Sequence, residues 1–116
     1  MLVQVKTDNH IEGNTRLHEW VRAEIEGTLE RFTPQLTRAE AYLSDLNSHK
    51  TGQVDKQCTL EVRVAGFDPI AVTKDANTLE AALDAALDAI TLALDGRIEK
   101  QHAKKGRTPM GGIPGV

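Results

Sequence analysis

Five basic side chains lie close together near the C-terminal end of the chain. They fall within eleven residues and are Arg97, Lys100, Lys104, Lys105 and Arg107. A cluster of this kind can neutralise phosphate groups and release the counterions condensed on a nucleic acid, which makes binding strong at low salt. A second interpretation is a helix C-terminus whose cations complement the negative end of the helix dipole. The cluster alone leaves both interpretations open.

The charge of the chain is unevenly distributed. The 116 residues have a formal net charge of −3. Residues 1–95 carry 9 basic and 16 acidic side chains, a net charge of −7, whereas residues 96–116 carry 5 basic and 1 acidic, a net charge of +4. Attraction to a polyanion is therefore expected to come from the C-terminal end.

No arrangement of side chains predicts catalysis. Ser44-Asp45 lies outside any Gly-x-Ser-x-Gly turn, and His49 is explained as a loop residue. Four scattered histidines and one cysteine, Cys58, lack the spacing of metal ligands. Gly111-Gly112 has no helix after it, so no phosphate-binding loop is predicted. We expect a binding protein rather than an enzyme, with no metal, cofactor or small-molecule substrate.

Length and composition favour one cytoplasmic domain. A chain of 116 residues can bury its own hydrophobic core. A lone cysteine cannot form an internal disulfide, and neither an export signal nor a membrane-spanning run is visible, so we expect a cytosolic protein without a membrane partner. Glycine and proline recur from residue 106 on. We therefore expect a domain over residues 1–105 and a flexible tail over residues 106–116.

Two segments have the spacing of amphipathic helices. Between Thr15 and Phe32 apolar residues recur every three or four positions, with Asn14 as the expected N-cap. Thr33-Pro34 is expected to end this helix, because proline disfavours helical geometry in the residue before it. Thr78 opens a second pattern of large apolar residues separated by alanines, which we expect to form a helix to about His102.

Four segments alternate between apolar and polar residues, as strands with one buried face do. The first is residues 2–6, and the inward sets of the others are Ala39, Ala41 and Leu43; Cys58, Leu60, Val62 and Val64; and Ile70 and Val72. Residues 44–56 are expected to form a long hairpin loop and Gly66-Phe67-Asp68 a tight turn. The predicted fold is α+β in the order β-α-β-β-β-α: a four-stranded, mainly antiparallel sheet with two helices on one face.

Several short segments together carry a family resemblance. The first strand is followed by Ile11-Glu12-Gly13-Asn14-Thr15-Arg16-Leu17, and the first helix continues with Glu19-Trp20-Val21. The second helix contains Ala82-Leu83-Asp84, then Asp88 and Ile90. With the order of the elements, these segments resemble the family of ribosome hibernation promotion factors and ribosome-associated inhibitors, also called sigma-modulation proteins. Residues 42–47 and 55–61 are similar to one short branch of it.

The resemblance implies a fold similar to double-stranded-RNA-binding domains and docking in the decoding channel of the small subunit of the bacterial ribosome. A protein placed there would occupy the space of messenger and transfer RNA and keep idle ribosomes inactive under stress. Basic side chains would contact the ribosomal RNA backbone by shape and charge. The candidates on this chain are Arg16, Arg22, Arg31, Arg97, Lys100, Lys104, Lys105 and Arg107.

Some positions depart from the family pattern. The residues that stand where the family often has basic side chains are Glu24, Gly27, Ala89, Leu92 and Gly96. The segment after the second helix is too short to be the C-terminal domain with which longer members pair ribosomes, so pairing by this chain alone is not expected. The charge of −7 over residues 1–95 and the position of Leu92 off the apolar stripe of the second helix suggest an alternative function. In it, the same fold is a protein-interaction or regulatory module that does not bind RNA.

Overall fold

The order of helices and strands agrees with the sequence prediction. The computed structural model describes residues 1–8, 11, 15–46 and 55–106, and over residues 99–106 it describes the backbone only. The elements are β1 (Leu2–Thr7), α1 (Thr15–Thr28), the 3-10 helix η1 (Glu30–Gln35), β2 (Leu36–Asp45), β3 (Lys56–Val64), β4 (Ile70–Ala76) and α2 (Leu79–Gly106). The α+β class and the order β-α-β-β-β-α are therefore confirmed. Asn14 and the tail from residue 107 lie outside the described residues.

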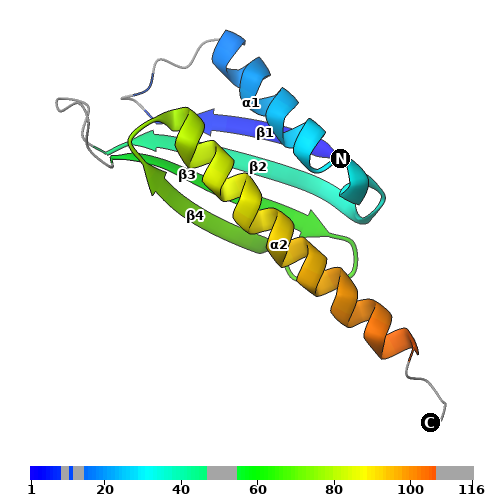
Figure 1. Cartoon of the computed structure of the whole chain (residues 1–116). Coiled ribbons are helices and arrows are strands. Elements are labelled where there is room, and N and C mark those ends of the chain that lie inside the picture. The colour runs from blue at the N-terminus through cyan, green and yellow to red at the C-terminus, as the bar shows by residue number, and fades with distance from the viewer. Residues whose placement is uncertain (9–10, 12–14, 47–54, 107–116) are drawn as a thin grey trace.

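The four strands form one mixed sheet in the order β1-β2-β3-β4. β2 pairs antiparallel with β3, and β3 with β4. β1 instead runs parallel to β2, with Val3 opposite Ala39. A parallel pair needs a long crossover connection, and α1 supplies it. Both helices lie on the same face of the sheet (Figure 1), as predicted.

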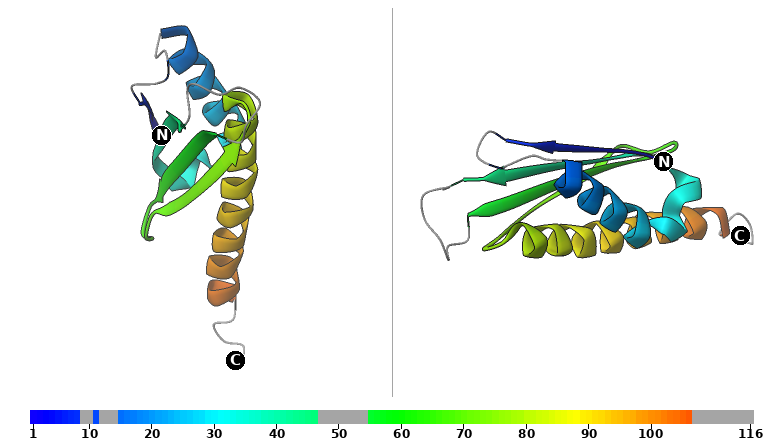
Figure 2. Two further views of the ribbon diagram at one scale, coloured as in Figure 1. Left: turned by 90° about the vertical axis from the view of Figure 1, so that its left-hand side faces the viewer. Right: turned by 90° about the horizontal axis from the view of Figure 1, so that it is seen from above.

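The core lies between the sheet and the two helices, which form two layers (Figure 2). The inward residues predicted for β2 and β3 are all buried, and so is Ile70 at the start of β4. Val72 is partly buried and packs against the same core. The helices contribute the buried side chains Val21, Ile25, Leu83, Ile90 and Leu94. Period-two strands and three-to-four-spaced helices thus meet on the faces that the sequence assigns to them.

Cys58 behaves as a small apolar side chain. It is fully buried in β3. Burial disfavours the charged thiolate and raises the pKa of the Cys58 thiol to about 12. The thiol is therefore protonated at neutral pH, and the sequence prediction that Cys58 faces the core is confirmed.

The first helix ends earlier than predicted. α1 stops at Thr28, and the chain continues as η1, which contains Pro34. A single helix to Phe32 is therefore wrong. The Phe32 N–H donates to the carbonyl of Leu29 over 3.0 Å, which is the tighter i→i+3 bond of a 3-10 turn. This turn buries both Leu29 and Phe32 just before Pro34, whose missing N–H could not continue an α-helix.

The second helix continues farther than predicted, to Gly106 instead of about His102. Thr78 caps its start, because Thr78 Oγ1 accepts a hydrogen bond of 3.0 Å from the N–H of Ala81. At 1.5 Å per residue its 28 residues span about 42 Å. Its C-terminal part extends past the end of the sheet (Figure 1). Within the described residues no helix is both long and apolar enough to cross a membrane.

An ion-paired cluster joins β2 to β3 on either side of residues 47–54. Lys56 Nζ lies 2.9 Å from Asp55 Oδ1 and 3.3 Å from Asp45 Oδ1. The Leu46 N–H donates to the Asp55 carbonyl over 2.8 Å. The hydrogen bond that Lys56 donates to Asp55, together with the nearby Asp45 carboxylate, raises the pKa of Lys56. These contacts fix the ends of the predicted hairpin loop, whose central residues lie outside the described part of the chain.

The β3–β4 connection is the tight turn that the sequence predicts. Gly66 has a φ of +83°, a left-handed conformation that favours glycine because other residues carry a Cβ. The Phe67 N–H donates to the Val64 carbonyl over 3.0 Å and closes the turn. The Ala65 N–H donates to the Gln35 carbonyl over 2.9 Å, so the turn is also tied to η1.

A pair of leucine variants tests which face of α2 is buried. Leu83 is fully buried, whereas the side chain of Leu92 is 73% exposed. Leu83→Ala should lower the free energy of unfolding by about 2–5 kcal/mol because it leaves a cavity in the core. Leu92→Ala, the matched control, should change it by no more than about 0.5 kcal/mol. Urea unfolding followed by circular dichroism measures both, and equal losses would contradict this orientation of α2.

Candidate nucleic-acid interface

The predicted basic cluster lies on the C-terminal half of α2. Arg97, Lys100, Lys104 and Lys105 all fall within this helix, and Arg107 lies outside the described residues. With 3.6 residues per turn, positions 97, 100 and 104 are on one side of the helix. The helix therefore turns a cluster in the sequence into a row of cationic positions, which begins beside the β3–β4 turn and continues onto the part of α2 that extends past the sheet (Figure 1).

Arg97 is held against the β3–β4 turn. Its Nη1 donates to the Asp68 carbonyl over 3.3 Å. Its guanidinium carbon lies 5.7 Å from the centre of the Phe67 ring, which is within the range of a cation–π contact. Arg97 is thus the point where the basic row joins the folded body. Phe67 was not among the predicted site residues, because the sequence does not show that the turn and α2 meet.

Arg31 forms an ion pair within the domain. Its Nη1 and Nη2 each lie 2.9 Å from a carboxylate oxygen of Asp95 on α2. The guanidinium also lies over the Phe32 ring, 4.1 Å from its centre. This two-pronged bond raises the pKa of Arg31 and lowers the pKa of Asp95. Asp95 therefore competes with any phosphate for Arg31, which the sequence could not show because 64 positions separate the two residues.

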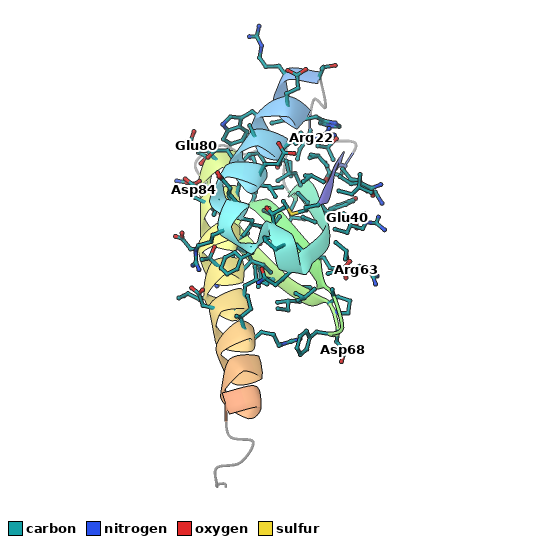
Figure 3. The ribbon with its side chains drawn as sticks, turned by 90° about the vertical axis from the view of Figure 1, so that its right-hand side faces the viewer. Arg22, Glu40, Arg63, Asp68, Glu80 and Asp84 are labelled. Carbon is teal, nitrogen blue, oxygen red and sulfur yellow. The ribbon has the colours of Figure 1, made fainter. Side chains whose placement is uncertain are left out.

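Arg16 and Arg22 belong to a separate region. Both are exposed on α1. Arg22 is labelled at the same end of the molecule as Glu80 but on the other side of α1 from it (Figure 3), whereas Arg97 is in the C-terminal half of α2. The structure therefore separates the predicted residues into a basic row on α2, an Arg31 paired with Asp95, and two arginines on α1 that are six residues apart and do not share a helix face. It does not bring them together as one patch.

The N-terminal half of α2 is acidic on its solvent side. Glu80, Asp84 and Asp88 are exposed and follow one another at four-residue spacing. At the divergent positions, Gly27 and Gly96 are exposed and a Cβ on either would meet open space. Glu24 and Ala89 are half-buried. The solvent-facing side of α2 is therefore negative over its first three turns, whereas Arg97 and positions 100 and 104 continue the side of the helix that faces the sheet and the β3–β4 turn.

The open face of the sheet carries further basic residues that sequence reasoning passed over. Lys6 lies 3.2 Å and Arg38 lies 3.0 Å from Glu40, which lowers the pKa of that carboxyl, chiefly through the bond from Lys6. Arg63 on β3 is exposed on the same face, whereas Lys74 on β4 is exposed but pairs with the buried Cys58 and so lies on the helix-covered side of this edge strand. Isolated cations on alternating strand positions are the ordinary outward residues of a sheet, so nothing in their spacing marks a site.

The comparisons with known proteins give a family and a fold. Residues 3–105 match the family described as sigma 54 modulation protein / S30EA ribosomal protein. The N-terminal domain of Thermus thermophilus Protein Y is 19% identical and superposes with a TM-score of 0.62 over 78% of this chain and 91% of that one. A ribosomal subunit interface protein from Coxiella burnetii is 13% identical, with a TM-score of 0.64 over 85% and 99%. No curated protein matches the chain significantly.

The fold and the basic row define a small α+β binding domain. The match over residues 3–105 spans most of the chain, and the chain therefore belongs to the sigma 54 modulation protein / S30EA ribosomal protein family. This confirms the family resemblance seen in the sequence. The two solved structures share the fold with this chain at low identity, so they support the architecture and not the roles of single residues.

The Arg31–Asp95 pair makes a testable pH prediction. The pKa of Asp95 lies below its ordinary value of 3.8 in the folded protein because Arg31 donates to the carboxylate. The pair therefore stabilises the fold above the unfolded pKa, and this contribution is lost as the pH falls through the lower folded pKa. NMR titration of the Asp95 carboxyl should give a midpoint below 3.8. Arg31→Gln should move the midpoint upward, whereas Lys74→Gln should not; an unmoved midpoint in Arg31→Gln would reject the pair.

Proposed function

We propose that this protein is a ribosome-binding translation inhibitor of the cytoplasm, in which residues 1–105 form the binding domain. It would occupy the decoding channel of the small ribosomal subunit and keep idle ribosomes inactive under stress. Membership of the sigma 54 modulation protein / S30EA ribosomal protein family supports action on the ribosome. The similar fold from Coxiella burnetii is named a ribosomal subunit interface protein, which supports the same partner.

The observation that carries this proposal is the basic row on the C-terminal half of α2. Arg97, Lys100 and Lys104 are on one side of a helix that continues past the sheet, with Lys105 and Arg107 beyond. A helix of this length can carry cations to phosphates that the two-layer body itself does not reach. Contact to phosphates needs charge and shape and no base sequence, which suits the backbone of ribosomal RNA.

Inhibition by this protein would need no chemical step. A domain that fills the path of messenger and transfer RNA prevents translation as long as it stays bound. Affinity therefore determines the activity, and the contribution of lysine and arginine to that affinity falls steeply as salt is raised. Arg16 and Arg22 on α1 would add contacts at the other end of the domain. Arg31 would contribute only if its ion pair with Asp95 were broken.

Cosedimentation with purified ribosomes tests the proposal. The wild type should pellet with the small subunit at about 50 mM salt and be released progressively toward about 200 mM salt. A variant with Arg97, Lys100, Lys104, Lys105 and Arg107 changed to alanine should remain in the supernatant. Alanine keeps the helix, because it is the strongest helix former. A wild type that stays in the supernatant at low salt would refute the proposed function.

A charge-matched control separates a specific basic row from general attraction. Lys100→Ala/Lys104→Ala and Arg63→Ala/Lys74→Ala each remove two positive charges, the first pair from α2 and the second from exposed strand positions. The α2 pair should weaken ribosome binding by about tenfold or more at low salt. The strand pair should leave it nearly unchanged. Equal losses in the two variants would mean that net charge, and not the row on α2, drives binding.

One observation favours a second function. The exposed acidic residues Glu80, Asp84 and Asp88 make the first half of α2 unsuited to a polyanion and suited to a basic protein partner. In that case the fold would serve as a protein-interaction module that does not bind RNA. Pull-down from a lysate treated with RNase should then still recover a specific protein, and Glu80→Gln/Asp84→Gln/Asp88→Gln should abolish its recovery. Loss of every partner on RNase treatment would reject this alternative.

A further inference from the structure

A shallow hollow lies between the β3–β4 turn and α2, at the start of the basic row. It has a volume of about 550 Å³, opens to solvent and is lined by Gly66, Phe67, Asp68 and Arg97. Two elements that are distant in the sequence build it: the left-handed turn at Gly66 and the middle of α2. We call this hollow the turn notch.

The guanidinium of Arg97 is held in place in the turn notch, and it keeps hydrogen-bond donors for a ligand. A guanidinium has five N–H donors, and one of them goes to the Asp68 carbonyl at 3.3 Å. Among the described residues no carboxylate forms an ion pair with Arg97, in contrast to Arg31, which has Asp95. Arg97 is therefore a pre-positioned cation with donors left for a ligand that carries negatively charged oxygens.

The turn leaves room for such a ligand. Gly66 has no side chain, and a Cβ placed there would meet nothing within 4 Å, so a ligand can approach the backbone directly. Asp68 is labelled in Figure 3, where its side chain points outward from the end of the turn and away from α2. The half-buried Phe67 ring lies 5.7 Å from the guanidinium carbon and restricts the conformations open to the Arg97 side chain.

We propose that the turn notch is a phosphate-binding site that takes one phosphate of ribosomal RNA. This inference rests on the proposed function and extends the interface from α2 to the β3–β4 turn. Arg97 donates to the phosphate oxygens, and Phe67 is a positioning residue that acts through Arg97. RNA is favoured over a phosphorylated peptide because positions 100 and 104 continue the positive charge on the same side of α2, as a chain of successive phosphates requires.

Salt-dependent ribosome binding tests both roles. Arg97→Ala should weaken binding roughly tenfold at low salt. It should also reduce the slope of log K against log salt by about 0.7–0.9, the value for one phosphate contact. Phe67→Leu should weaken ribosome binding several-fold without changing that slope. Phe67→Tyr keeps the aromatic ring and should therefore bind like the wild type. Arg63→Ala is the matched control on the open face of the sheet and should change neither quantity.

A second measurement separates this site from the ribosome proposal. In ¹⁵N-labelled protein titrated with a single-stranded RNA hexamer, the amides of Gly66 and Asp68 should shift, and Arg97→Ala should abolish the shifts. Normal ribosome binding by Arg97→Ala with an unchanged slope would overturn the turn notch and leave the ribosome proposal standing. Amide shifts at Gly66 in a wild type that does not bind ribosomes would leave the turn notch standing and overturn the ribosome proposal. Larger shifts with a phosphoserine peptide than with the hexamer would overturn the assignment to RNA.

Discussion

The packing of α2 across the sheet is the constraint on which the rest of this structure depends. The inward side chains of β2 and β3 are apolar, so one face of the sheet must be covered. α2 covers it with Leu83, Ile90 and Leu94, and with small residues such as Ala82 and Ala86 that allow close approach. Because the helix is anchored as far as Leu94, the last turns can extend from the body without losing their direction.

That extension separates the two signs of charge along a single helix. The anchored part presents Glu80, Asp84 and Asp88 to solvent, and the part beyond Leu94 carries Arg97 and the lysines after it. A net charge of −3 for the chain therefore says little about the local charge that a partner would meet, since the two signs lie on different parts of α2. The same separation explains how an acidic chain can belong to a family of ribosome-associated proteins.

Local pairing decides which cations remain available. Arg31, Lys6 and Arg38 each have a carboxylate within about 3 Å of a side-chain nitrogen, and Lys56 has two within 3.3 Å. Arg97 instead bonds a backbone carbonyl and faces an aromatic ring. A contact of that kind orients a guanidinium without neutralising it. A positive charge is thus kept available at the place where three elements meet: the β3–β4 turn, η1 and α2.

The sequence by itself determined the element order, the inward faces of the strands and the location of the basic cluster, because these follow from local periodicity and from composition. It did not determine the parallel pairing of β1, the end of α1 at Thr28 or the length of α2. These depend on the crossover, on the burial of Phe32 ahead of Pro34 and on the packing of Leu94 and Ile98 against the core on either side of Gly96. Only the tertiary structure could show that Asp95 forms an ion pair with Arg31 and that the Phe67 ring contacts Arg97. Both contacts join residues far apart in the chain, and no spacing along a sequence encodes the approach of two such side chains.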